Sequence, residues 1–175
     1  MAGLWPLTRH NLIPHYSAIG IIQTVEPCCR AALLHKHRPE NVLVSELLDE
    51  QGHYSVLTTP LPDGHFFTGG DLKYLSMVYF LEIARQCYMQ IAHDVLQIPL
   101  GIPMNLVTLH FSLDAPIPRQ RTLRVMADKQ PLSAGSYGRT NTINLLLQVG
   151  QQRLGEARIV AQALDGHYVT YPQFS

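Results

Sequence analysis

The spacing of hydrophobic and polar residues changes along the chain, and each change marks a different kind of element. Residues 31–36, 41–48 and 53–59 are short apolar runs of the kind that predicts β-strands. The last two flank Asp49-Glu50-Gln51-Gly52, which favours a turn, so we expect a β-hairpin there. Residues 1–20 show little periodicity and contain prolines and glycines, which predicts an N-terminal arm or loop.

A long apolar segment follows, over residues 72–96. It lacks glycine and proline, Asp71 precedes it as a potential N-cap, and Pro99 follows it. We predict a single helix of about 25 residues, about 37 Å long at a rise of about 1.5 Å per residue. Because the segment is apolar on almost every side, the helix should be buried, with a sheet on one side and other structure opposite.

Four more β-rich segments follow this helix, over residues 104–113, 122–128, 139–149 and 153–164. Strands, one long apolar helix and then further strands indicate an α+β domain in which an antiparallel sheet wraps around a central helix. The 175 residues fit a single domain, which we place at residues 1–175.

Composition limits the classes of partner. Thirteen Lys and Arg residues balance thirteen Asp and Glu residues, which argues against nucleic acid. Charged residues make up 15% of the chain, against about 25% in typical domains, and this shortage weakly favours an oligomer. The three cysteines, with Cys28 and Cys29 adjacent and Cys87 in the helix, have no disulfide or metal-ligand spacing. Without an evident signal peptide or an apolar run of about 18 residues, we expect a cytoplasmic protein with no membrane segment.

The polar residues of the predicted helix share one face. At about 100° per residue, Arg85, Gln86 and His93 all lie near the direction of Glu82. A lone buried carboxylate is costly, and Arg85, at i+3, can supply its partner. Such a pair either anchors the helix or a dimer seam, or it lines a cleft where it performs acid–base work and holds an anion. Both interpretations remain open from these residues.

Several stretches resemble the AfsA-type hotdog family of A-factor (γ-butyrolactone) signal biosynthesis. They lie in family order at residues 35–43, His65-Phe66-Phe67, Glu82-Ile-Ala-Arg85-Gln86, Ala92-His93 and Ile98-Pro99-Leu100-Gly101. The resemblance implies a hotdog fold without a cofactor. It also implies an acyltransferase of secondary metabolism that moves a β-ketoacyl group from a thioester of acyl carrier protein or CoA to a glycerone-phosphate-like hydroxyl.

The same resemblance implies roles for particular residues. Glu82 would be the catalytic base on the acceptor hydroxyl, and Arg85 would orient Glu82 or bind an anionic group. Four further residues are expected to bind substrate: His65, Phe67, Gln86 and His93. The best-known members hold two hotdog repeats, whereas this chain holds one, so we expect a homodimer.

Three alternative functions stay open: a hotdog dehydratase, a hotdog thioesterase and a non-catalytic acyl-binding module. A hotdog dehydratase or thioesterase would also act on an acyl thioester, and His65 with Glu82 faintly resembles the histidine and carboxylate pair of such dehydratases. A non-catalytic acyl-binding module would tolerate the loss of Glu82. His35 and His37 have the spacing of two metal ligands on a strand, but no third ligand is evident, so we expect no metal site.

Overall fold

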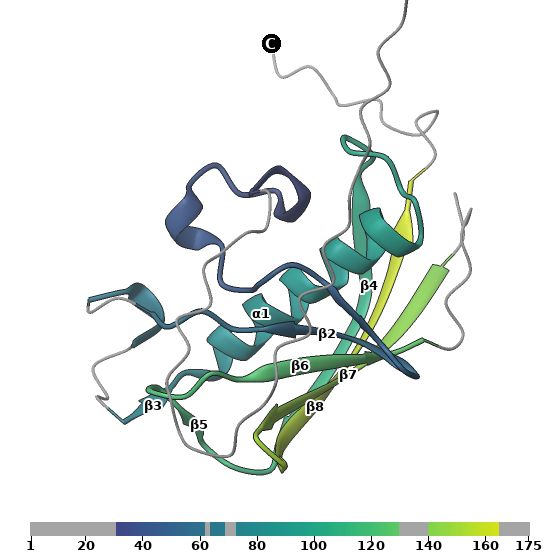
Figure 1. The fold of residues 1–175 in the computed structure, drawn as a ribbon. Coiled ribbons are helices and arrows are strands. Elements are labelled where there is room, and N and C mark those ends of the chain that lie inside the picture. The colour runs from purple at the N-terminus through teal and green to yellow at the C-terminus, as the bar shows by residue number, and fades with distance from the viewer. Residues whose placement is uncertain (1–30, 62–63, 69–72, 130–139, 165–175) are drawn as a thin grey trace, which may run out of the picture.

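The computed structural model describes residues 31–61, 64–68, 73–129 and 140–164; the predicted arm and Cys28-Cys29 lie outside them. Its main feature is a six-stranded sheet in the order β1-β2-β6-β7-β8-β4, in which every neighbouring pair is antiparallel (Figure 1). The strands are β1 (Leu48–Glu50), β2 (His53–Leu57), β4 (Met104–Leu113), β6 (Arg124–Asp128), β7 (Thr140–Val149) and β8 (Gln152–Ala163). The predicted antiparallel α+β architecture is confirmed.

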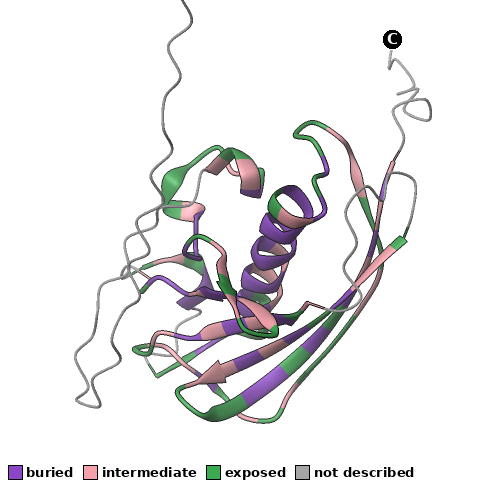
Figure 2. Cartoon of the chain, turned by 45° about the vertical axis from the view of Figure 1, so that its right-hand side comes forward, coloured by how far each residue is buried: buried purple, intermediate pink, exposed green. Residues whose placement is uncertain are grey.

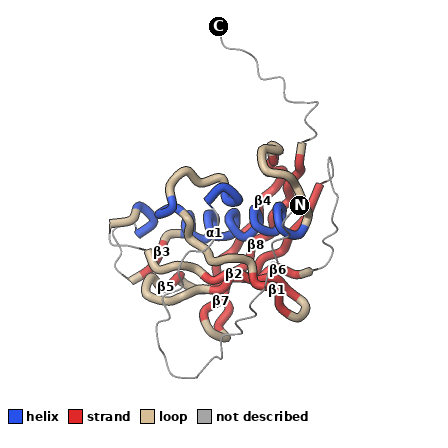
Figure 3. Tube along the Cα trace, turned by 45° about the horizontal axis from the view of Figure 1, so that its top comes forward, coloured by secondary structure: helices blue, strands red, loops and turns tan. Residues whose placement is uncertain are grey.

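The long helix begins later than the apolar pattern predicts. Helix α1 (Met77–Gln90) continues directly into a π-helical segment, η4 (Ile91–Val95). Residues Tyr74–Leu75 instead form the short strand β3, which pairs with β5 (Ile117–Pro118) (Figure 3). The predicted start at residue 72 is therefore wrong, because pairing with a distant strand overrides local helical propensity. Ser76, rather than Asp71, occupies the N-cap position, and Asp71 lies outside the described residues.

The predicted burial of the helix is confirmed. The curved sheet holds α1 against its concave face, and every residue from Tyr79 to His93 is buried or half-buried (Figure 2). The side chains that face the helix from the sheet include Ile143, Leu147 and Ile159, which belong to the same core. The opposite side is covered by residues 31–45, whose buried members are Leu34, Val42, Leu43, Val44 and Ser45. Much of the structure expected on the side of the helix opposite the sheet therefore comes from the same chain.

Residues 31–36 do not form the predicted strand. Ala31–Leu34 make a turn of 3-10 helix, η1, closed by a 2.9 Å hydrogen bond from the Lys36 amide to the Ala31 carbonyl. His35 follows in the left-handed region with φ of 53°, which is uncommon for a residue other than glycine. A second turn, η2 (Pro39–Asn41), leads into the extended residues 42–45. Residues 31–41 fold against the helix, and residues 43–45 meet the sheet through backbone hydrogen bonds to residues 57–59.

The hairpin prediction is confirmed with shorter strands. β1 and β2 pair around Gln51-Gly52, and Gly52 has a φ of 88° that favours glycine. β1 begins only at Leu48; upstream, a single bridge joins Val44 to Thr58. The four strands predicted after the helix are all present, with bounds moved by at most two residues.

Two further features follow from the packing. Cys87 is fully buried, as predicted, and burial raises the pKa of its thiol to about 12.

Gly155 on β8 lies so close to β4 that a Cβ there would be 2.4 Å from the Ser112 carbonyl oxygen. Within the described ranges, no helix has the length and apolar character needed to span a bilayer.

Candidate active site

Glu82 is the centre of a polar network on the face of α1 that residues 31–45 cover. Its Oε1 accepts hydrogen bonds from Arg85 Nη2 at 2.9 Å and Gln86 Nε2 at 2.7 Å, and forms a 2.8 Å ion pair with Lys36 Nζ. Among the described residues its Oε2 accepts one bond, from Arg85 Nε at 3.0 Å. The sequence pattern predicted the pairing with Arg85, and the structure confirms that pair.

The electrostatics of the network fix the charge of Glu82. Burial alone would raise the pKa of this carboxyl, since its side chain is only 16% exposed. Hydrogen bonds from Arg85, Gln86 and Lys36, together with the charge of Arg85, outweigh burial and lower the pKa to about 2. Glu82 is therefore an ionised carboxylate throughout the physiological pH range.

Two glutamines on the helix hold the covering segment in place. Gln86 is fully buried; its Oε1 accepts from the Leu43 amide at 2.8 Å, and its Nε2 donates to Glu82 and, at 2.9 Å, to the Asn41 carbonyl. One turn later, Gln90 donates to the Ser45 carbonyl at 2.8 Å. These bonds satisfy the Leu43 amide and the Ser45 carbonyl, which a longer strand would pair, and residues 43–45 accordingly join the sheet by a single bridge, Val44 to Thr58.

The turn after η1 supplies three consecutive residues to the same helix face. The Leu34 carbonyl accepts a 3.1 Å hydrogen bond from Arg85 Nη2, and Lys36 reaches Glu82. Between them, the exposed His35 places its ring 5.5 Å from that of His93, centroid to centroid. The helix stripe and the turn therefore form one unit, which we call the Glu82–His93 cluster: Leu34, His35, Lys36, Glu82, Arg85, Gln86 and His93.

His93 closes the C-terminal end of this cluster. It is 8% exposed, and its Nδ1 lies 2.6 Å from the Ile98 carbonyl oxygen. Its Nε2 is buried and has no hydrogen-bond partner among the described residues. A buried polar atom without a partner costs about 1–3 kcal/mol, so its retention needs an explanation.

His65 and Phe67 lie apart from that cluster, near the start of α1. They belong to the turn around η3 (Phe66–Thr68), where the His65 ring stacks on Phe67 at 5.2 Å and Phe67 meets Tyr79 edge-on at 5.7 Å. His65 Nδ1 accepts the Phe67 amide at 3.3 Å, and burial lowers the pKa of this histidine. The predicted site residues therefore fall into two groups, one beside the start of α1 and one that runs along the helix from Glu82 to His93.

The sequence pattern missed three members of the site. Lys36 and His35 lie in a run that the pattern assigned to a strand, and Gln90 was counted among the helix residues without a role. The four charged or titratable residues 35–38 stand out in a chain so poor in charge, and that cluster is the signal that could have found them.

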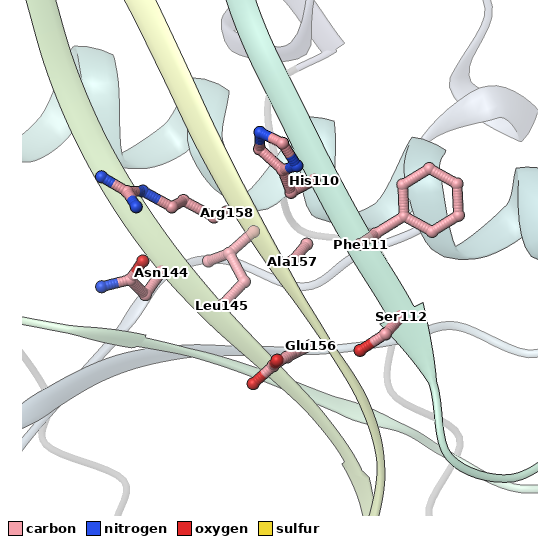
Figure 4. A pocket seen from close by; sticks show the side chains of 8 residues that line it. All are labelled: His110, Phe111, Ser112, Asn144, Leu145, Glu156, Ala157 and Arg158. Atoms are coloured by element: carbon pink, nitrogen blue, oxygen red, sulfur yellow. The ribbon is translucent and has the colours of Figure 1, made fainter.

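One cavity lies elsewhere, on the sheet, with a volume of about 310 Å³ (Figure 4). His110, Asn144 and Arg158 are register partners on three adjacent strands, and they project from the face turned away from α1. Glu82 does not line this cavity, so a cleft at Glu82 stays a prediction. In the part of the chain that the structure describes, no three His, Cys, Asp or Glu side chains are grouped to hold a metal ion.

Comparison with known proteins completes these observations. The family described as AfsA, A-factor biosynthesis hotdog domain, matches residues 21–165. Among solved structures, an HP0420 homologue from Helicobacter felis is 15% identical with a TM-score of 0.52, over 77% of this chain and 99% of that chain. A thioesterase superfamily protein from Shewanella loihica is 13% identical with a TM-score of 0.51, over 68% and 90%. No curated protein matches the chain. The predicted hotdog fold is confirmed.

Proposed function

The chain belongs to the A-factor biosynthesis hotdog domain family, and from that premise we propose that it is an acyltransferase acting on an acyl thioester. The donor is a β-ketoacyl group on acyl carrier protein or CoA, and the acceptor is the hydroxyl of a phosphorylated, glycerone-phosphate-like molecule. One observation carries the proposal: the cationic part of the Glu82–His93 cluster has unused donors beside a partly open carboxylate.

The charge of the cluster suits a phosphate. Lys36 and Arg85 carry two positive charges against the single negative charge of Glu82. Their side chains are 23% and 38% exposed, and Arg85 Nη1 donates to no described residue. An ammonium also has three N–H donors, of which Glu82 engages one. We assign these free donors to the acceptor's phosphate, which Lys and Arg bind through charge-assisted hydrogen bonds.

Glu82 then orients the acceptor hydroxyl. A carboxylate with a pKa of about 2 is a weak base at neutral pH, because proton acceptors work best with a pKa near the working pH. Its Oε2 nevertheless accepts only one bond from the described protein and can take a second from a hydroxyl. For Gln86, whose polar atoms are already engaged, we propose a positioning role in place of the substrate contact expected from sequence.

The acyl chain has an apolar surface leading to this point. Val78 is 54% exposed and lies one helical turn before Glu82, on the same side of α1. Met77 is also exposed at the start of α1, and the exposed Phe66 lies beside the His65 ring. Because His65 Nδ1 accepts the Phe67 amide, the proton of the neutral ring sits on Nε2, which can donate to the thioester carbonyl. We therefore propose that His65 and Phe67 bind the acyl donor.

We also propose that two chains associate through strand β4. β4 ends the sheet, and no strand of the described residues pairs with its outer edge along its ten residues. Three large apolar side chains on this strand are exposed: Leu106 at 59%, Val107 at 56% and Phe111 at 36%. Long apolar edge strands pair readily with another chain. A second copy of this chain would supply hydrogen-bond partners for the outer edge of β4 and would cover its exposed apolar side chains.

Mass spectrometry of reaction products tests the function. The protein is mixed with a β-ketoacyl-CoA, or the acyl carrier protein thioester, and glycerone phosphate. We expect a new acyl ester of the acceptor together with free thiol. Free β-keto acid alone would indicate a thioesterase. Absence of the ester, with loss of water from a β-hydroxyacyl thioester supplied in a second reaction, would indicate a dehydratase. Binding of the thioester with no turnover would indicate an acyl-binding module, and each of these three results contradicts transfer.

A further inference from the structure

The proton on His93 is fixed by its environment. A carbonyl oxygen can only accept a hydrogen bond, so the 2.6 Å contact with the Ile98 carbonyl places a proton on His93 Nδ1. In the neutral ring, Nε2 is then a bare acceptor, and it is the nitrogen that has no partner among the described residues. The chain therefore holds an oriented, buried hydrogen-bond acceptor that its own described groups leave unused.

His35 is a titratable side chain whose ring packs beside that of His93. Its ring lies 5.5 Å from the ring of His93, and it is exposed, whereas His93 is buried. Its position is tied to the cluster on both sides, because Leu34 binds Arg85 and Lys36 binds Glu82. The backbone of His35 has a φ of 53°, an uncommon conformation that tends to occur at functional sites. The turn thus presents an imidazole that both Arg85 and His93 influence.

We propose that His35 is the general base of the transfer reaction and that His93 is the residue that positions it. A small rotation of the His35 ring lets one N–H donate to His93 Nε2, and its other nitrogen then faces the acceptor hydroxyl. In the resulting chain of hydrogen bonds the Ile98 carbonyl holds His93, and His93 orients His35. A base oriented by a second group in this way is the arrangement that activates a nucleophile. This inference rests on the proposed acyltransferase function.

The step balances without any further reactant. The hydroxyl oxygen attacks the thioester carbonyl carbon as its proton moves to His35, and an oxygen–carbon bond forms. The tetrahedral intermediate then collapses, the carbon–sulfur bond breaks, and the protonated His35 returns the proton to the departing thiolate. The products are an ester and a free thiol.

The surroundings of His35 suit this role better than those of Glu82. Burial, then His93, then Arg85 lower the pKa of His35, so the ring is a neutral acceptor at neutral pH. His93 on η4 and Arg85 on α1 are the titratable or charged groups of the described chain that act on it. The neighbouring Lys36 is turned to Glu82, whose pKa of about 2 makes it the weaker base.

Replacement of His35 by asparagine tests the assignment. Asparagine tolerates the left-handed backbone at this position, so His35→Asn removes the imidazole while preserving the turn. We expect kcat to fall by about 100-fold or more, the range of general base catalysis, with little change in the KM for glycerone phosphate or in Tm. His37→Asn, two residues away and exposed, is the matched control and should transfer at the wild-type rate.

Two further variants separate catalysis from packing. His35→Gly also suits the left-handed backbone and leaves space for added imidazole, which should restore part of the activity. His93→Asn keeps a side-chain amide near the Nδ1 position but removes Nε2. It should lower kcat with little change in the KM for glycerone phosphate, because His35 loses the acceptor that orients its ring.

The possible results separate failure of the His35 assignment from failure of the acyltransferase proposal. A wild-type protein that forms no ester overturns the acyltransferase proposal and the base assignment together. A wild-type protein that forms the ester, with an equally fast His35→Asn variant, overturns the base assignment alone. An inactive His35→Gly variant that folds normally but gains nothing from imidazole, with an unchanged kcat in His93→Asn, also overturns it.

Discussion

Replacing Glu82 with glutamine removes the charge on which the network depends. The new side chain would have nearly the same shape, but Arg85 and Lys36 would lose their anionic partner, and an amide N–H₂ would face a guanidinium that can only donate. The fall of the Glu82 pKa from 4.5 to about 2 corresponds to about 3 kcal/mol, at about 1.4 kcal/mol per pKa unit. Because Arg85 is 38% exposed, solvent weakens the interaction, and we expect a net loss of about 1–2 kcal/mol.

The sign of the pH dependence makes this prediction specific. The folded-state pKa of Glu82 is depressed, so its contribution to stability is complete above the unfolded pKa of about 4.5 and is lost as pH falls towards about 2. Chemical denaturation should show Glu82→Gln to be less stable than the wild type at pH 7, with the difference shrinking through that acid window. At about 2–4 °C per kcal/mol for a chain of this size, Tm at neutral pH should fall by about 2–8 °C.

Glu40→Gln provides the control, since Glu40 is exposed and its nearest cation, Arg38, is 4.0 Å away. That variant should match the wild type within error at every pH. Equal stability of Glu82→Gln and wild type at pH 7 would refute the network energetics, and so would a deficit that stays constant down to pH 3. Transfer activity per folded molecule should also fall in Glu82→Gln, because the acceptor hydroxyl loses its anionic hydrogen-bond acceptor.

Three other predictions concern the frame around the site. Gly155→Ala should destabilise the fold by about 1–3 kcal/mol in denaturant titrations, since its Cβ would meet the Ser112 carbonyl oxygen at 2.4 Å; wild-type stability would contradict the β4–β8 contact. Cys87 should resist thiol reagents, followed by mass spectrometry of its peptide, until the protein unfolds, because it is fully buried and its pKa is about 12. Val107→Lys should convert the proposed dimer to monomer in sedimentation; an unchanged mass would exclude pairing through β4.

The local hydrophobic pattern predicted those elements whose structure is not changed by contacts with distant parts of the chain. Strands β6, β7 and β8 alternate more buried and more exposed residues because one face packs on the core, so their positions were predictable to within two residues. The start of α1 was not, because Tyr74–Leu75 pair with β5, more than forty residues away in sequence. Residues 31–36 are similar: their apolar run resembles a strand, but the helix binds their backbone through Arg85.

The part of the candidate site that lies on one face of α1 was predictable from the sequence. The spacing of Glu82, Arg85 and Gln86 follows from 3.6 residues per turn, and their contacts follow from that spacing. The contributions of His35 and Lys36 depend on how a distant turn folds back onto the helix, which no periodicity records. The resemblance to the family marked residues 35–43, but it did not indicate what they touch.

The most direct test of the central claim is the rate of ester formation with two acceptors that differ only in the phosphate, glycerone phosphate and glycerone. If Lys36 and Arg85 bind the phosphate, kcat/KM for glycerone phosphate should exceed that for glycerone by about 100-fold, the equivalent of about 3 kcal/mol. Lys36→Gln should reduce that preference mainly by slowing the phosphorylated acceptor. Equal rates with both acceptors, or a preference that Lys36→Gln leaves unchanged, would contradict the account.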